Sequence, residues 1–434
     1  MSMFNAGIAG IVLLILFFFV GMPVSFAFAL AGVLGFFYVG GIEGGLSILA
    51  IETFSNFSSY GLTVIPMFVF MGSLTFAGGI SAKLFDFGFT LFGRIRGGLA
   101  LSTVAACAAF AAVCGSTAAT AAAMGKVALP EMKRYKYGDS IATGCLAASG
   151  SLGILIPPSA TLIVYAMLTE QSVGKLFIAG VLPGLLLAAL FALAVILWCF
   201  YDPDIAPPGP ATSIKQKLIA FAKVSDTLIL FFVVMGGLFT GWFTPTQAGA
   251  AGAAGALIIT LVRRKLTWRA LLEAFEDTIK TSCMIMVLIA GALIFSRFLA
   301  VTGVPRVLSD WIGGLPLSPF TIMALIVLFH FVAGTVLDSF GLILLTVPVL
   351  YSTILKLGFD PIWYGIIIIL VVEMGVISPP EGLNIWIVRG LAPDAPMQSI
   401  FKGMIPFCLA ILVCAVLLMI FPQIVLFLPS FMSY

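Results

Sequence analysis

Long apolar stretches without charged residues alternate with short polar segments along this chain. A helix needs roughly 20 apolar residues to cross the hydrocarbon core of a membrane, and two of the stretches are long enough for two crossings each. Leu, Ile, Phe, Ala and Gly fill them without the strict alternation of a transmembrane strand, which favours a helical bundle over a β-barrel. The charge-free runs include 3–42, 140–169, 176–201, 227–262 and 403–434.

Composition narrows the class of protein further. Hydrophobic residues make up 62% of the chain and charged residues 9%, whereas soluble domains have about 45–50% and 25%. A water-soluble enzyme is therefore excluded. The seven cysteines have no paired spacing, and we interpret them as small hydrophobic side chains. The net charge of +3 is too small to indicate a nucleic-acid partner. No cleavable signal peptide is expected, because the first run lacks a basic start.

Basic clusters, which mark the cytoplasmic side, predict how the chain enters the membrane. Arg94 and Arg96 precede an apolar, Ala-rich segment, and the cluster 126–136 follows it. One crossing would place one cluster outside, so we expect 97–125 to form a re-entrant hairpin with its tip at CGSTAAT (114–120). The alternative is one ordinary helix with a small-residue packing face.

The two halves of the sequence repeat one another. IPPSAT at 156–161 recurs as SPPEGL at 378–383, and each is preceded by a glycine at the same spacing. Further pairs occur in the same order: Pro23 with Pro245, Gly72 with Gly291, GST at 115–117 with GTV at 334–336, Pro130 with Pro348, and Pro183 with Pro406. Counting crossings puts the second half in the opposite orientation, and inverted repeats are typical of secondary transporters.

We therefore expect an all-α polytopic membrane protein with two inverted-topology repeats, re-entrant hairpins and Pro-Pro-broken helices. The first repeat, 1–201, comprises scaffold helices 4–40, an interfacial arm 43–60, a hairpin 97–125 and a broken helix 139–169. A cytoplasmic linker, 202–225, leads to the second repeat, 226–434, with scaffold helices 227–262, a hairpin 318–355 and a broken helix 362–388.

The hairpin tips and the Pro-Pro turns are the candidate ion sites. Prolines within the membrane free backbone carbonyls, and carbonyls with Ser and Thr hydroxyls suit a hard cation such as Na⁺, while half-helix N-termini suit an anionic substrate. The alternative is that these small residues only permit close helix packing. The residues are Ser116, Thr117, Gly153, Ile156 and Pro157 for one site and Gly334, Thr335, Gly375 and Ser378 for the other.

Ionisable residues inside apolar segments are costly, so each is a functional candidate. Glu52 and Glu273 read as interfacial charges, and the single His, His330, reads as a packing residue. One His excludes an H-E-x-x-H metalloprotease, and no Ser–His or paired-Asp arrangement supports another intramembrane enzyme. Two opposed hairpins fit a transporter with alternating access better than they fit a channel. The candidate substrate-binding residues are Ser159, Asp338, Asn384 and Arg297.

Motifs across essentially the whole chain resemble the large membrane (M) subunit, DctM-like, of tripartite ATP-independent periplasmic (TRAP) transporters. They are PMFVFMGSLTFAGG (66–79), GSTAATAAAMGKVALPEM (115–132), ASGSLGILIPPS (148–159), YAMLTEQSVGKLFIAGVLPG (165–184) and SPPEGLN (378–384). The resemblance implies a sodium-coupled importer of organic acids, such as C4-dicarboxylates or sialic acid, in the bacterial inner membrane. It also implies a periplasmic substrate-binding protein, a small four-helix Q subunit and an elevator mechanism.

Carried over, the resemblance implies sodium ligands at Gly115 and Ser116, with Gly153, Ile156 and Pro157, and at Gly334, Gly375, Ser378 and Glu381. Two positions depart from the family pattern, because Cys114 replaces a serine of the tip and Glu381 replaces an apolar residue. The landmarks begin close to Met1, so we expect Q to be a separate chain. The alternative within transport is a stand-alone sodium/carboxylate symporter that needs neither binding protein nor Q subunit.

Overall fold

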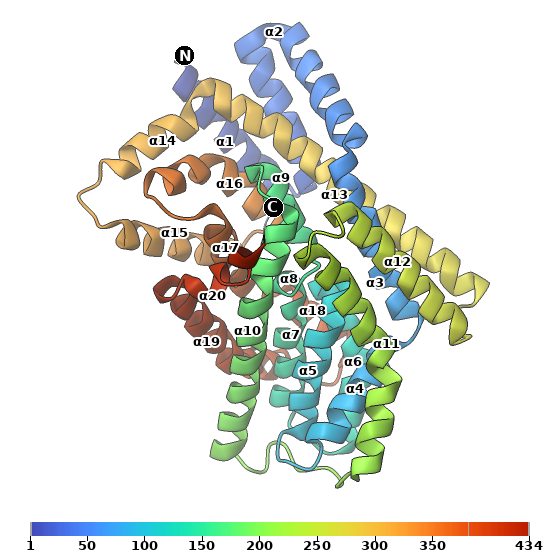
Figure 1. Ribbon diagram of the computed structural model, residues 1–434. Coiled ribbons are helices and arrows are strands. Elements are labelled where there is room, and N and C mark those ends of the chain that lie inside the picture. The colour runs from blue at the N-terminus through green and yellow to red at the C-terminus, as the bar shows by residue number, and fades with distance from the viewer. Residues whose placement is uncertain (1, 381, 433–434) are drawn as a thin grey trace.

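The computed structural model describes residues 2–380 and 382–432, and in this part of the chain it contains helices and no strands (Figure 1). Nine helical segments there are long and apolar enough to cross a membrane. The prediction of an all-α polytopic membrane protein is confirmed at this level.

The first half folds into ten helices and a short 3-10 turn. Gly41 adopts a positive φ of 72° inside α2 and divides it into two arms, and the second arm covers the stretch predicted as interfacial. The helices are α1 Met3–Phe19, α2 Val24–Ser58, α3 Val64–Ala77, α4 Ile80–Phe92, α5 Gly98–Cys114, α6 Thr117–Arg134, α7 Asp139–Gly150, α8 Leu152–Leu155, α9 Ala160–Thr169 and α10 Val173–Tyr201, with η1 at Tyr60–Thr63.

The second half follows a similar order. Its first helix begins at Ile214, so the latter part of the predicted linker 202–225 is helical, where Ser213 and Gln216 form a capping box. The helices are α11 Ile214–Phe239, α12 Pro245–Val262, α13 Trp268–Thr302, α14 Val304–Gly313, α15 Pro319–Gly334, α16 Ser339–Lys356, α17 Pro361–Val376, α18 Leu383–Leu391, α19 Met397–Ile420 and α20 Gln423–Leu426, with η2 at Pro429–Phe431.

Each half contains a helical hairpin followed by an interrupted helix. The hairpins are α5–α6 and α15–α16, and the interrupted helices are α7–α8–α9 and α17–α18. Prolines interrupt α7–α8–α9 and α17–α18. A proline lacks the backbone N–H that continues a helix, and its ring clashes with the preceding turn. The first hairpin extends to Arg134, beyond the predicted end at residue 125.

The long helix α13 crosses the molecule and packs along both arms of α2 (Figure 1). Gly32 allows this approach, since a Cβ there would lie 2.9 Å from the backbone nitrogen of Phe295. Asn56 donates from Nδ2 to the carbonyl oxygen of Met286 at 2.9 Å. These contacts join the first half to the second.

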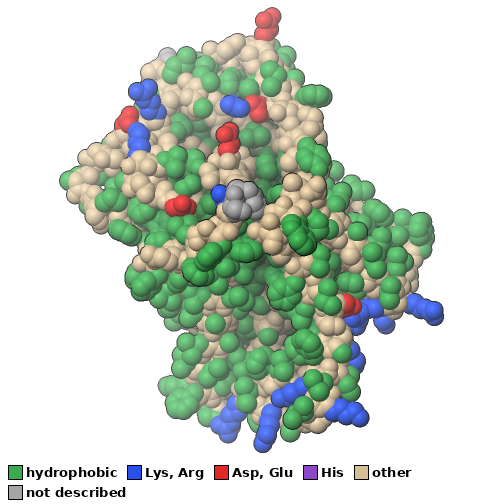
Figure 2. Space-filling model, viewed as in Figure 1, with side chains coloured by type: hydrophobic (Ala, Val, Ile, Leu, Met, Phe, Trp, Pro, Cys, Tyr) green, Lys and Arg blue, Asp and Glu red, His purple; other side chains and the backbone are tan. Residues whose placement is uncertain are grey.

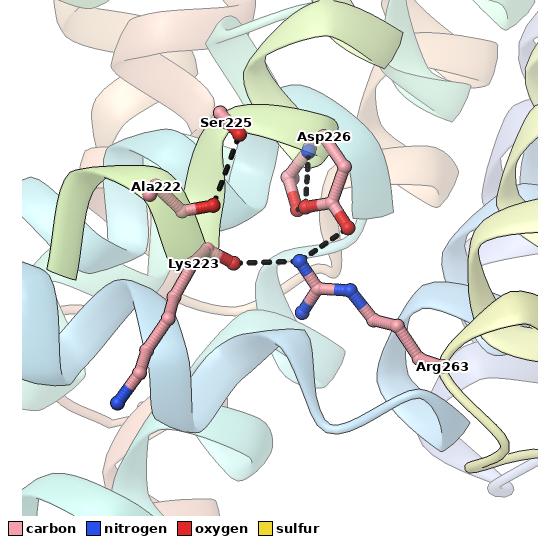
Figure 3. A network of polar contacts seen from close by, with 6 residues as sticks. Ala222, Lys223, Ser225, Asp226 and Arg263 are labelled. Carbon is pink, nitrogen blue, oxygen red and sulfur yellow. Dashed lines mark hydrogen bonds and ion pairs between the residues drawn. The ribbon is translucent and has the colours of Figure 1, made fainter. Parts of the chain in front are cut away.

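A polar network ties α11 to the end of α12 (Figure 3). Arg263, the residue that caps α12, donates from Nη2 to the carbonyl oxygen of Lys223 at 2.6 Å and forms an ion pair with Asp226. Further basic residues flank this network, at 215–217 before Lys223 and at 264–265 after Arg263. Lys and Arg side chains gather along the lower edge of the molecule (Figure 2). This is the side that the positive-inside rule assigns to the cytoplasm.

Candidate ion and substrate site

The first tip, residues 114–117, joins α5 to α6. Gly115 ends α5 with a left-handed φ of 67°, a conformation that favours glycine. Ser116 then caps α6, and its hydroxyl accepts a hydrogen bond from the Ala119 N–H at 3.3 Å. Sequence and capping chemistry together therefore fix a sharp reversal of the chain at this point.

The first turn, residues 156–159, lies directly against the first tip. A Cβ on Gly153 would lie 2.9 Å from the carbonyl carbon and oxygen of Ser116, and one on Gly115 would collide with the carbonyl oxygen of Pro158. Only glycine permits these approaches. The sequence-predicted residues Gly115, Ser116, Thr117 and Gly153 are thus brought together as main-chain neighbours.

The remaining first-site residues line the same region. Ile156 and Pro157 form the break between α8 and α9, and Ser159 caps α9 by accepting a hydrogen bond from the Leu162 N–H at 3.4 Å. Asn384, from the second half, joins them: its Nδ2 donates to the carbonyl oxygen of Ala147 at 3.0 Å, and its side chain is almost fully buried. One residue of the second half therefore belongs to the first site.

The second tip, residues 334–338, joins α15 to α16. Asp338 caps α16, and its carboxylate accepts hydrogen bonds from the Phe340 and Gly341 N–H groups at 3.2 and 3.3 Å. The Thr335 hydroxyl donates to the carbonyl oxygen of Val332 at 2.8 Å. The candidate substrate ligand Asp338 is thus engaged in holding the tip.

The second turn, residues 377–380, approaches the second tip in the same way. A Cβ on Gly375 would lie 2.6 Å from the carbonyl carbon of Gly334, and one on Gly334 would lie 2.9 Å from the carbonyl oxygen of Val372. Ser378 donates from its hydroxyl to the Met374 carbonyl oxygen at 2.6 Å. Gly334, Gly375 and Ser378 are therefore neighbours, whereas Glu381 lies outside the described residues.

Sequence reasoning overlooked Glu373, which lies in α17 two residues before Gly375. Its side chain is 3% exposed, and the Ser339 hydroxyl donates to its Oε2 at 3.2 Å. The sequence itself marks this residue, since Glu373 is the one charged residue in the apolar run of α17. An acid in such a run is a functional candidate by the same rule that selected Asp338.

Two other sequence candidates lie away from the tips. Arg297 on α13 forms an ion pair at 3.0 Å with Glu52, which directs its guanidinium toward the second arm of α2. His330 is buried within the second hairpin, where its Nε2 lies 3.0 Å from the Thr346 hydroxyl and its Nδ1 2.7 Å from the Ile326 carbonyl oxygen. The roles of Arg297 and the other proposed ligands stay predictions.

Both tips offer main-chain carbonyls and hydroxyls, and the second tip adds the carboxylate of Asp338. In the described part of the chain, no group of three or more His, Cys, Asp or Glu side chains could hold a metal ion. A transition-metal site would need such nitrogen, sulfur or carboxylate ligands. In transporters, unwound backbone carbonyls can coordinate cations.

Comparison with known proteins decides the family. Residues 11–424 match the model of the tripartite ATP-independent periplasmic transporter, DctM component. This chain belongs to the DctM family.

The DctM family includes curated relatives that span nearly the whole chain. The C4-dicarboxylate TRAP transporter large permease protein DctM of Pseudomonas aeruginosa is 34% identical, covering 91% of this chain and 94% of its own. The sialic acid TRAP transporter large permease protein SiaM of Vibrio cholerae is 30% identical, covering 96% and 97%. These relatives are permease subunits, which are not enzymes, and they support a multi-pass protein of the bacterial inner membrane.

A solved structure supports the fold alone. The Alcanivorax borkumensis YdaH transporter superimposes with a TM-score of 0.66 at 15% identity and covers 87% of this chain and 89% of its own. The TRAP large permease assignment rests on the family match and on the curated relatives.

Proposed function

We propose that this large permease imports an organic acid in symport with Na⁺, and that the two tip–turn contacts form its ion sites. The observation that carries the proposal is the duplicated backbone approach, Gly153 against Ser116 and Gly375 against Gly334. Each approach gathers carbonyl oxygens at a helix break. Each also leaves the start of a helix, α9 and α18, beside the break, where the positive end of the helix dipole favours an anion.

The relatives support a substrate class and partners. The two named above are permeases for C4-dicarboxylate and sialic acid, both of which carry carboxylates. We propose a carboxylate substrate for this chain, handed over by a periplasmic binding protein, with a small Q membrane subunit beside the permease. Asn384 and Ser159 are the proposed substrate contacts nearest to the first site.

We further propose that the two hairpins and the interrupted helices move together against a scaffold that includes α2 and α13. α17 packs on α8, α9 and α15, so the hairpin elements of both halves form one packed unit. α2 and α13 pack against each other through both arms of α2. An elevator movement needs two such packed bodies.

Ion binding can be tested on the purified chain alone. A ligand that binds only the folded protein raises its apparent stability. We expect the unfolding temperature in detergent to rise with NaCl and not with KCl at equal ionic strength. Ser116→Phe and Ser378→Phe should each fold and lose part of this response. An equal response to both salts, or unchanged responses in both variants, would contradict the ion sites.

Delivery by a binding protein needs a separate test. Proteoliposomes that contain the permease with its Q subunit should take up labelled C4-dicarboxylate or sialic acid with an inward Na⁺ gradient only when the periplasmic binding protein is added. Equal uptake without that protein would favour the stand-alone sodium/carboxylate symporter.

A further inference from the structure

An apolar groove runs along the outer side of the second half, between α15 and α19, with α17 as its floor. Its volume is about 990 Å³, and its walls are almost entirely carbon. The wall on α19 extends from Phe401 to Ile420, which corresponds to about 28 Å of helix. This is close to the roughly 30 Å thickness of the hydrocarbon core. α15 and α19 lie on one side of the molecule, and hydrophobic side chains dominate the surface there (Figures 1 and 2).

The corresponding helices of the first half pack directly on each other. The repeat pairs α15 with α5 and α19 with α10, and α10 packs directly on α5. At Gly97, which precedes α5, a Cβ would lie 2.7 Å from the Cys199 sulfur and 2.9 Å from the Val195 side chain, both on α10. In the second half α15 packs on α17, and α19 packs on α7, α10 and α17, so the described chain leaves the groove between them open.

One cation lies at an end of the groove. Lys402 is exposed on the second turn of α19, and it forms no ion pair within the described residues. Gly403 beside it touches the backbone of Ser140 at the start of α7, which follows the basic cluster 126–136. Lys402 therefore lies near the cytoplasmic end, where long basic side chains reach toward lipid headgroups.

We propose that the groove binds an anionic phospholipid of the cytoplasmic leaflet. Its phosphate would contact the Lys402 ammonium, and its acyl chains would lie along α19 over Cys408 and Leu412. Charge selects this occupant, because the otherwise apolar groove has an exposed lysine at its cytoplasmic end. From Lys402 to Leu412 the helix rises about 15 Å, which is half of the hydrocarbon core and matches the acyl chains of one leaflet.

The groove also borders the second tip, because Thr335 and Ser378 are among its lining residues. A bound acyl chain would close this side of the second tip toward the bilayer. That consequence rests on the proposed function, but lipid binding itself does not, since it is measured without sodium or substrate.

The test is lipid retention by the purified full-length permease. The protein is incubated with a mixture of phosphatidylglycerol and phosphatidylcholine, and native mass spectrometry counts what stays bound. We expect preferential retention of phosphatidylglycerol. Lys402→Ala should weaken it about fivefold, as one lysine near an anionic membrane surface contributes. Lys215→Ala, which removes an exposed lysine on α11, is the matched control and should retain the lipid.

A second pair of variants tests the groove rather than the charge. Ala324→Trp fills the groove from α15, and Leu325→Trp adds the same ring on an exposed part of α15 outside the lining. Only Ala324→Trp should lose the lipid. Equal retention of both lipids, or equal loss in Ala324→Trp and Leu325→Trp, would overturn the proposal.

Cross-linking tests the other occupants. Leu412→Cys, in a Cys283→Ser background that removes an exposed thiol, should stay monomeric in oxidised membranes. A disulfide-linked dimer would show that a second copy covers the groove. A cross-link to a cysteine-bearing Q subunit would show that Q covers it. Either product would overturn the lipid assignment.

Discussion

The first and second tip–turn contacts share a backbone plan and differ in their polar content. In both, a glycine of an interrupted helix touches the main chain of a hairpin tip, Gly153 at Ser116 and Gly375 at Gly334. The first contact carries no acid of its own, whereas the second has Asp338 in its tip and the buried Glu373 beside it. The backbone geometry is therefore the common element, and the charge is specific to one half.

The surroundings of the two contacts also differ. The first contact lies among the packed helices α5, α7 and α10. Asn384 of the second half reaches this region and donates to the carbonyl oxygen of Ala147 in α7. The second opens on one side to the groove between α15 and α19. One contact is thus enclosed by helices and the other borders an apolar groove, so the two contacts differ in how closely the protein surrounds them.

The largest expected effect comes from removing the shared glycines. Gly153→Ala and Gly375→Ala each place a Cβ within 3 Å of backbone atoms that cannot rotate away, and such overpacking costs about 1–3 kcal/mol. We expect both variants to lower the unfolding temperature in detergent and to abolish uptake.

Gly390→Ala is the control for this pair, because a Cβ there meets nothing within 4 Å. It should be neutral or slightly stabilising, as Ala is the better helix former. If Gly153→Ala were tolerated and Gly375→Ala were not, the two contacts would not share one design.

Asn384 tests whether the first site depends on the second half. Asn384→Leu keeps the volume and removes the amide, so we expect the apparent affinity for substrate to fall at least about tenfold, the value of a hydrogen bond to a charged group. Uptake kinetics in proteoliposomes measure this.

Asn56→Leu is a matched control for Asn384→Leu. The Asn56 side chain is also buried and also donates from Nδ2 to a distant carbonyl, that of Met286 in α13. Both variants should lose similar stability, and only Asn384→Leu should alter substrate affinity. A parallel loss of uptake in both would reduce Asn384 to a packing role.

Hydropathy and charge spacing predicted the helical membrane fold, because the number of apolar residues in each run is set by the bilayer. The helix ends beside Gly115, Pro157 and Pro379 have local signals, since small residues and prolines interrupt helices. That 97–125 is re-entrant in the membrane stays a prediction. The partners across the fold were not predicted. Neither the approach of Asn384 to Ala147 nor the pairing of Arg297 with Glu52 has a sequence signal, because such contacts depend on how separate helices pack.

Glu373 tests the difference in charge between the two contacts. Glu373→Gln keeps the shape and the hydrogen-bonding partner Ser339 while removing the charge, so we expect the apparent Na⁺ affinity to fall about fivefold, as the loss of about 1 kcal/mol would give. Ser151, its counterpart in the first half, donates to the Ala148 carbonyl oxygen. Ser151→Ala should leave the Na⁺ dependence of uptake unchanged, and equal shifts in both variants would remove the asymmetry.

The smallest effect is expected at Lys133 and Asp394, which join the end of α6 to the loop after α18 at 2.8 Å. Both side chains are exposed, and pairs of this kind contribute little and are screened by salt. The Lys133 ammonium, through a hydrogen bond and its charge, lowers the pKa of the Asp394 carboxyl below its ordinary value of 3.8. A carboxyl with a depressed pKa stabilises the folded state above its ordinary pKa, and this contribution is lost as the pH falls through the depressed value. Asp394→Asn should therefore leave uptake intact and reduce the unfolding temperature slightly at neutral pH and low salt, with the difference vanishing once the pH lies below the depressed pKa or in high salt. A large loss of uptake would show that this exposed pair couples the two halves during transport, and the distinction between tip–turn contacts and surface contacts would fail.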